Sequence, residues 1–146
     1  MFKMIWNHNA AENSFKTASA CHGNHSLPRG LYIKRPSFFS CGENIHVSQR
    51  KEPWRKVVGE WERENRIFVY GKGGNHKDVG HYTQMVWANS YLLGCALVKC
   101  ENRDLILFYC QYCPAGNDNW NMPTPYEKGP WCTKCKGKCE NRLCIP

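Results

Sequence analysis

The chain has 146 residues, a length that fits one domain or one domain with a small appendage. Its formal charge of +8 favours acidic partners such as sulfated glycans or anionic cell surfaces, although a solvated basic face would give the same composition. No run approaches the roughly 18 apolar residues of a membrane-spanning helix, which argues against a membrane span.

The ten cysteines point to an oxidising compartment. An even number fits complete pairing into five disulfides, although the number alone does not say which cysteines pair. No secretory signal is visible, because the segment from Met1 to His8 lacks a charged start followed by a long apolar stretch. If the protein is secreted, we expect the signal to lie upstream of Met1 or to be absent from this form.

A first amphipathic helix is predicted from Lys3 to Ala20. Apolar side chains recur there at helical spacing, at Met4, Ala11, Phe15 and Ala18. A loop rich in glycine, proline and histidine is expected to follow, from Cys21 to Ser40.

A second helix is predicted to open at Pro53, a position where the missing N–H of proline costs nothing. Its predicted buried stripe comprises Trp54, Val57, Val58, Trp61 and Phe68. Glu64 lies on the same stripe, where an unpaired carboxylate is costly. Either the helix end frays and Glu64 reaches water, or a partner comes from elsewhere, with the histidines as the obvious candidates.

Two strands are predicted, from Leu92 to Lys99 and from Leu105 to Tyr112. Both are short and rich in aliphatic and aromatic side chains, and a polar turn from Glu101 to Asp104 separates them. A hairpin with helices to pack on it indicates an α+β domain.

The composition changes from about Asn117. Proline and glycine interrupt any regular element after this point, and four cysteines crowd together, at Cys132, Cys135, Cys139 and Cys144. With few apolar side chains, this segment needs covalent links or metal to hold it. We therefore predict a domain at residues 1–117 and a cysteine-rich tail at residues 118–146.

Two segments carry the most specific pattern. The run Gly80–Trp87 (GHYTQMVW) places a histidine among aromatic and apolar residues, and the run Tyr109–Asn117 (YCQYCPAGN) joins two cysteines to a Pro-Ala-Gly-Asn reversal. Together they resemble the two signature segments of the cysteine-rich secretory protein family, part of the CAP superfamily. The resemblance covers nearly the whole chain. It implies a CAP-type α-β-α sandwich followed by a disulfide-rich hinge tail, in an extracellular recognition protein.

The family framework accounts for all ten cysteines. In the core domain the resemblance implies the pairs Cys21–Cys100, Cys41–Cys113 and Cys95–Cys110. In the hinge tail it implies Cys132–Cys139 and Cys135–Cys144. Closing loops of this kind typically contributes ~2–4 kcal/mol per disulfide, which would hold a segment that cannot fold by burial alone.

The resemblance also implies a central cleft lined by two histidines and two glutamates, which match His25, His81, Glu43 and Glu64. In such proteins the two histidines can hold a zinc ion, so His25 and His81 are the expected metal ligands here. Imidazole nitrogen suits zinc, and two protein ligands leave open positions on the ion. Glu43 and Glu64 would then orient the imidazoles or a bound water.

Two other classes of site fit less of the chain. An enzyme centre is not expected, because the sequence has no H-E-x-x-H helix and no G-x-S-x-G elbow. The spacing of Cys110 and Cys113 from Cys132 and Cys135 matches a four-cysteine zinc ribbon, which with the basic charge would suggest an intracellular nucleic-acid or protein-binding module. That alternative leaves six cysteines unexplained and lacks the aromatic and basic interleaving of a nucleic-acid surface. We therefore expect no nucleic-acid partner.

The pattern departs from the family at both ends of the chain. The family's first helix has no counterpart ahead of Met1, and its C-terminal ion-channel-regulator module has none after Pro146, so a shortened form is expected. The resemblance then implies a secreted, non-enzymatic ligand of a cell-surface receptor or sperm membrane protein, with a role in reproduction. The alternatives are a venom-type toxin or ion-channel modulator, which the missing module disfavours, a sterol or lipid carrier, and a weak metal-dependent hydrolase. Asn24 begins a glycosylation sequon in the predicted loop.

Overall fold

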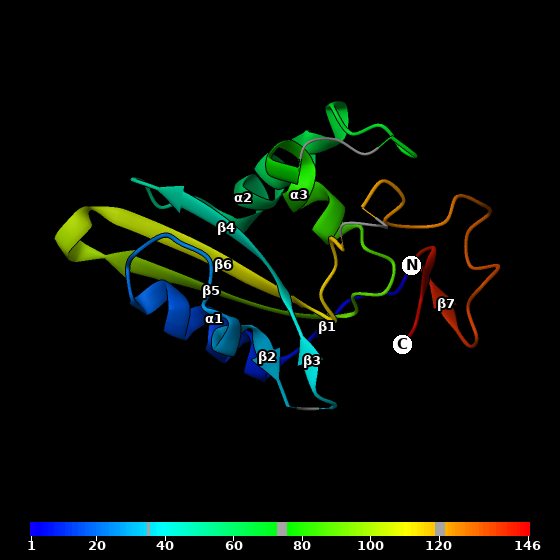
Figure 1. Cartoon of the computed structure of the whole chain (residues 1–146), viewed down its shortest axis with the longest axis horizontal. Helices are drawn as coiled ribbons and strands as arrows, with labels where there is room; N and C mark the ends of the chain where they lie inside the picture. Colours follow the sequence, from blue (N-terminus) through cyan, green and yellow to red (C-terminus); the bar gives the residue numbers. More distant parts are fainter. Residues whose placement is uncertain (35, 73–75, 119–121) are drawn as a thin grey trace.

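A four-stranded sheet forms the centre of the molecule (Figure 1). The structure is a computed structural model that describes residues 1–34, 36–72, 76–118 and 122–146. The strand order is β1 (Ile5–Trp6), β5 (Leu92–Cys100), β6 (Leu105–Cys113) and β4 (Gly42–Ser48). β1 runs parallel to β5, and the other neighbours are antiparallel. The predicted hairpin is confirmed, with β5 and β6 joined by the turn η3 (Glu101–Arg103).

Helices cover both faces of this sheet (Figure 1). α1 (His8–Ser19) lies on one face, and α2 (Trp54–Glu62), η2 (Arg63–Arg66) and α3 (His76–Met85) lie on the other. Successive side chains of β6 point to opposite faces, so Phe108 shares a core cluster with Val57 of α2 and Tyr109 shares one with Ala18 of α1. Two hydrophobic layers result, and the predicted α+β fold of the α-β-α sandwich type is confirmed.

The first helix begins later than the apolar spacing predicts. Ile5 and Trp6 form β1, because their backbone pairs with β5 at the edge of the sheet. The helix starts at His8, and Asn7 caps it by accepting a hydrogen bond from the N–H of Ala10 at 2.9 Å. The prediction of one helix from residue 3 is therefore wrong, because pairing with a distant strand outweighs the local helical pattern.

Small side chains form the buried face of α1, at Ala10, Ser14 and Ala18. Phe15, predicted to be on that face, is 55% exposed. A Cβ atom at Gly94 of β5 would lie 2.1 Å from the backbone nitrogen of Ala11, so helix and strand are in close contact there. Ser14 Oγ also donates to the carbonyl oxygen of Gly94 at 3.0 Å. A larger residue on either side would separate the two elements.

The second helix also ends earlier than predicted. α2 ends at Glu62, so Phe68 lies beyond it, and Val58 is 40% exposed while Val57 and Trp61 are buried. Glu64 lies in η2 instead of on the helix stripe. The patterns above predict neither β4 nor α3, and the predicted loop contains the turn η1 (Pro28–Leu31) and the small hairpin of β2 (Tyr32–Ile33) and β3 (Phe39–Ser40).

Five disulfides hold the fold together. They join the pairs named above from the resemblance: Cys21–Cys100, Cys41–Cys113, Cys95–Cys110, Cys132–Cys139 and Cys135–Cys144. Cys110 and Cys113 are thus bonded to cysteines of the core and have no thiolate to offer a metal. The zinc-ribbon alternative is excluded for this reason.

The tail folds back against the start of the chain (Figure 1). It carries the hairpin of β7 (Cys139–Glu140) and β8 (Leu143–Cys144). Lys3 donates its N–H to the carbonyl oxygen of Cys144 at 2.8 Å, and its ammonium group lies 2.8 Å from the carboxylate of Glu140. The division at residue 117 remains a prediction. No helix in the described ranges is long and apolar enough to span a membrane.

Candidate functional site

The two signature segments are in direct contact. α3 carries the first segment as far as Met85, and the loop after β6 carries the end of the second. Gln84 of α3 accepts a hydrogen bond from the N–H of Gly116 at 3.0 Å. Asn117 Nδ2 donates to the carbonyl oxygen of Gly80 at 2.7 Å. These bonds hold α3, and with it His81, against the end of the sheet.

His25 and Glu43 form one histidine–carboxylate pair. Glu43 lies on β4 with its side chain 1% exposed, and His25 lies in the loop after α1 with its side chain 67% exposed. His25 Nδ1 is 3.1 Å from Glu43 Oε1. The carboxylate also accepts hydrogen bonds from the N–H and hydroxyl of Ser26, at 2.9 and 2.5 Å, and from Gln111 Nε2 at 3.3 Å. These donors compensate its burial and fix its orientation.

His81 and Glu64 form the second pair. His81 Nδ1 is 2.6 Å from Glu64 Oε1, and the other carboxylate oxygen accepts the N–H of Tyr82 at 2.9 Å. The ring of Trp61 stacks on His81 with centroids 5.9 Å apart. Asn44 of β4 donates to the carbonyl oxygen of His81 at 3.1 Å. The sequence left open whether Glu64 reaches water at a frayed helix end or pairs with a residue from another segment. The structure shows the second outcome, because Glu64 pairs with His81.

The hydrogen bond to Glu43 raises the pKa of His25 above its ordinary value, and it outweighs the opposite effect of burial. Burial by itself would raise the pKa of Glu43. Hydrogen bonds from His25, Ser26 and Gln111 outweigh burial, so the pKa of that carboxyl lies below its ordinary value. Glu43 is consequently ionised at neutral pH and favours the protonated form of His25.

The chemistry of the two histidines fits a zinc ion. In each histidine a carboxylate engages Nδ1, which leaves Nε2 as the nitrogen for a metal. A ligating histidine ordinarily donates its other ring N–H to such a carboxylate. Among the described residues, no three of His25, His81, Glu43 and Glu64 place ligand atoms within 4.8 Å of one another. Because each carboxylate contacts Nδ1, it would orient the imidazole from behind a metal held at Nε2.

A cluster of three sulfur atoms lies in the tail, at Cys132, Cys135 and Cys139. All three atoms belong to disulfides. Since a metal binds the thiolate form of cysteine, this cluster defines no metal centre.

The candidate glycosylation residue lies beside the first pair. Asn24 is exposed, and its backbone carbonyl accepts a hydrogen bond from the hydroxyl of Tyr109 at 2.7 Å. Burial first, and then the charge of Glu43, raises the pKa of Tyr109 to about 12. The phenol thus stays protonated and holds the Asn24 backbone while leaving its side chain in solvent.

Several residues of the site carry no signal in the sequence. Ser26, Gln111 and Asn44 position the two pairs through hydrogen bonds from the loop, β6 and β4. They have ordinary polar side chains, and their partners lie 17 to 68 positions away along the chain. The register of β4 against β6 places Glu43 opposite Gln111 and would have indicated Gln111.

A disulfide-held α-β-α sandwich with two histidine–glutamate pairs has the architecture of a CAP domain. Residues 2–112 match the cysteine-rich secretory protein family, and the chain belongs to this family. It is 43% identical to allurin of Xenopus tropicalis, over 99% of this chain and 72% of allurin. It is 42% identical to cysteine-rich secretory protein 2 of Cavia porcellus, over 99% of this chain and 59% of that protein.

A solved structure supports the same fold. The crystal structure of NaASP2 with Zn²⁺ superimposes with a TM-score of 0.75 at 30% sequence identity. The match covers 98% of this chain and 76% of NaASP2. A domain of this fold has therefore been crystallised with zinc.

Proposed function

We propose that this protein is a secreted, non-enzymatic ligand of a cell-surface receptor or sperm membrane protein, with a role in reproduction. The observation that carries the proposal is the 43% identity to allurin over 99% of the chain. A second relative and the family itself are named as secretory proteins. Five disulfides fit the oxidising conditions outside the cell.

Glu43 suits the positioning of His25 better than proton transfer. A general base needs a free lone pair and a pKa near the operating pH. Both oxygens of Glu43 accept hydrogen bonds, and its pKa is lowered. This carboxylate would therefore be a poor proton acceptor, which supports the proposal of a non-enzymatic ligand.

The proposal is tested by measuring binding of the fluorescently labelled, disulfide-intact protein to sperm of the source species and to erythrocytes. We expect saturable binding to sperm that excess unlabelled protein displaces, and directed swimming in a gradient of the protein if it acts as an attractant. The reduced and alkylated protein is the control and should not bind. Absence of saturable binding, or equal binding to both cell types, would contradict a sperm ligand.

Reversible zinc binding at His25 and His81 is the second part of the proposal. The support is the engagement of both Nδ1 atoms by carboxylates together with the zinc-containing relative. Changing both histidines to alanine should abolish zinc binding measured by calorimetry while the far-ultraviolet circular dichroism stays unchanged. His46→Ala is the matched control, because His46 also pairs with a carboxylate, that of Glu52 at 3.1 Å. Unchanged zinc affinity in the double variant would remove the metal assignment.

A further inference from the structure

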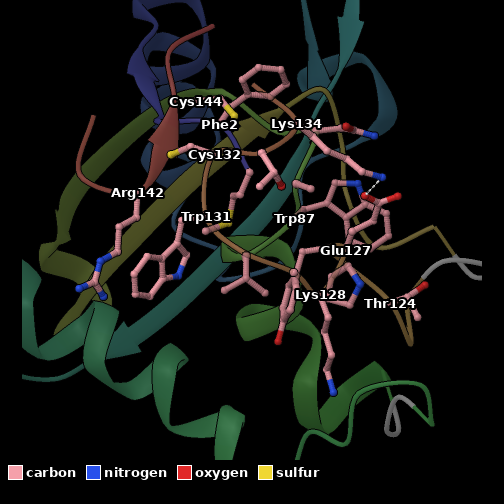
Figure 2. Close-up of a pocket in the computed structure, with 18 of the residues that line it drawn as sticks. Phe2, Trp87, Thr124, Glu127, Lys128, Trp131, Cys132, Lys134, Arg142 and Cys144 are labelled. Carbon is pink, nitrogen blue, oxygen red and sulfur yellow. Dashed lines mark ion pairs between the residues drawn. The ribbon is translucent and has the colours of Figure 1, made fainter. Parts of the chain in front are cut away.

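A hollow lies between the body of the molecule and its tail (Figure 2). It has a volume of about 910 Å³, within the range of small-molecule sites. The end of α3, the first two residues and the segment from Thr124 to Lys134 line it, and Arg142 completes the wall. The hollow shares no residue with the two histidine–glutamate pairs, so it is a separate candidate site.

Its lining is aromatic and polar more than aliphatic. Five aromatic rings contribute to the wall: Phe2, Tyr82, Trp87, Tyr126 and Trp131. Trp131 is 65% exposed, and few aliphatic side chains accompany the rings. Thr124, Thr133 and Asn89 add hydroxyl and amide groups. A lipid site would need an aliphatic enclosure, whereas flat rings beside hydrogen-bonding groups suit the apolar faces and hydroxyls of a sugar.

Three cations border the hollow, and two of them keep their charge available. Lys134 forms an ion pair with Glu127. In the described part of the chain neither Lys128 nor Arg142 has a carboxylate partner. Both lie over aromatic rings, Arg142 at 3.8 Å from the centroid of Trp131 and Lys128 at 4.3 Å from that of Tyr70. Such stacking orients a cation without neutralising it, and its N–H groups remain donors for an anion.

Covalent and backbone links hold this wall in place before any ligand arrives. Arg142 occupies the turn of the β7–β8 hairpin, with φ values of 50° and 68° at Asn141 and Arg142. Disulfides anchor Cys139 and Cys144, which face each other at the open end of that hairpin. Cys144 in turn donates its N–H to the carbonyl oxygen of Met1 at 3.0 Å. A preorganised site loses less entropy on binding than a loose tail would.

We propose that this hollow binds a sulfated oligosaccharide. Lys128 and Arg142 would engage its sulfate groups, and the face of Trp131 opposite Arg142 would stack on a sugar ring. The charge of +8 on the whole chain assists the approach of such a polyanion. This goes beyond the proposed cell-surface role and does not require it, because the hollow would recognise the sugar itself and not a receptor protein.

The test measures binding of a heparin-derived hexasaccharide by calorimetry at physiological ionic strength. The double variant Lys128→Gln, Arg142→Gln should bind at least about tenfold more weakly, since each charge-assisted hydrogen bond contributes enough for a loss of this size. The variant Lys99→Gln, Arg103→Gln removes the same charge from exposed residues that do not line the hollow, and it should change the affinity by less than about twofold, as expected for a screened distant charge.

Two further ligands test whether the hollow recognises the sulfate groups and the sugar rings. The desulfated hexasaccharide should bind much more weakly, and so should hexaglutamate, which carries negative charge without sugar rings. An equal loss in both double variants would mean general attraction of a polyanion and would overturn the site. Equal binding of hexaglutamate would overturn the choice of a sugar. If no hexasaccharide bound, the sugar site would be overturned, but the sperm-binding experiment could still succeed. The two proposals can therefore be tested independently.

Discussion

At the scale of single residues, the bond between His25 Nδ1 and Glu43 decides how this histidine titrates. The folded-state pKa of His25 is raised, so its contribution to stability is fully present below the unfolded-state pKa and is lost as the pH rises through the raised value. The pKa of Glu43 is lowered, so its contribution is present above the unfolded-state pKa and is lost as the pH falls through the lowered value. Both contributions coexist at weakly acidic pH.

Removing the charge of the carboxylate should therefore change the titration of the histidine. In metal-free protein, Glu43→Gln is expected to lower the pKa of His25, because the amide no longer stabilises the imidazolium. Nuclear magnetic resonance of the His25 ring against pH measures this value directly. Glu52→Gln, which removes the partner of His46, should leave the His25 titration as it is. An unchanged pKa in Glu43→Gln would show that the pair does not form in solution.

At the scale of elements, the close contact of α1 with β5 determines how the sheet is covered. Small side chains on the helix and the absence of a side chain at Gly94 allow it. The same contact explains why Phe15 faces solvent, because its neighbours Ser14 and Ala18 occupy the buried face. Tight packing here thus sets which helical residues are buried, whatever their hydrophobicity.

The variant Gly94→Ala should test this contact. Its Cβ would meet the backbone of Ala11, which cannot rotate away, so we expect a loss of about 1–3 kcal/mol in the free energy of unfolding, as for an overpacked core. Urea unfolding with the disulfides intact measures the loss. Gly59→Ala in α2 is the matched control, because nothing lies within 4 Å of its Cβ position, and it should stabilise the helix by about 0.5–1 kcal/mol. Equal effects at the two glycines would contradict the packing argument.

At the scale of the whole molecule, the tail is attached both to itself and to the start of the chain. Cys135–Cys144 closes the hairpin end that pairs with Met1 and Lys3. Few apolar side chains of the tail are buried, so covalent links and backbone hydrogen bonds carry most of its order. The division into a domain at residues 1–117 and a tail at residues 118–146 predicts that the tail can loosen while the sandwich stays folded.

The double variant Cys135→Ser, Cys144→Ser tests that division. Limited proteolysis should cut the tail, while the thermal midpoint of the sandwich should fall by only a few degrees, since Cys135–Cys144 constrains only a short loop of the unfolded chain, with a sequence separation of 9. The comparison is Cys41→Ser, Cys113→Ser, which opens a link within the buried core and should cost about 2–5 kcal/mol. A large loss of sandwich stability in the tail variant would show that the two parts fold as one unit.

Features that depend on neighbouring residues could be predicted from the sequence. The β5–β6 hairpin follows from two apolar runs around a polar turn, and the helix after Pro53 follows from its apolar stripe. The resemblance to the family also named His25, His81, Glu43 and Glu64, and the structure joins them in the pairs His25–Glu43 and His81–Glu64. Their role as a metal site stays a prediction. The number of cysteines indicated disulfides, and the resemblance supplied their pairing.

Features that depend on distant partners were decided only by the tertiary structure. Ile5 and Trp6 become a strand because β5 lies beside them, and Glu64 is paired because α3 brings His81 to it. The hollow at the tail exists because residues 124–134 and Arg142 meet the end of α3 and the first residues. Local patterns carry no information about such meetings, since burial, hydrogen-bond partners and cavities depend on which segments the fold brings together.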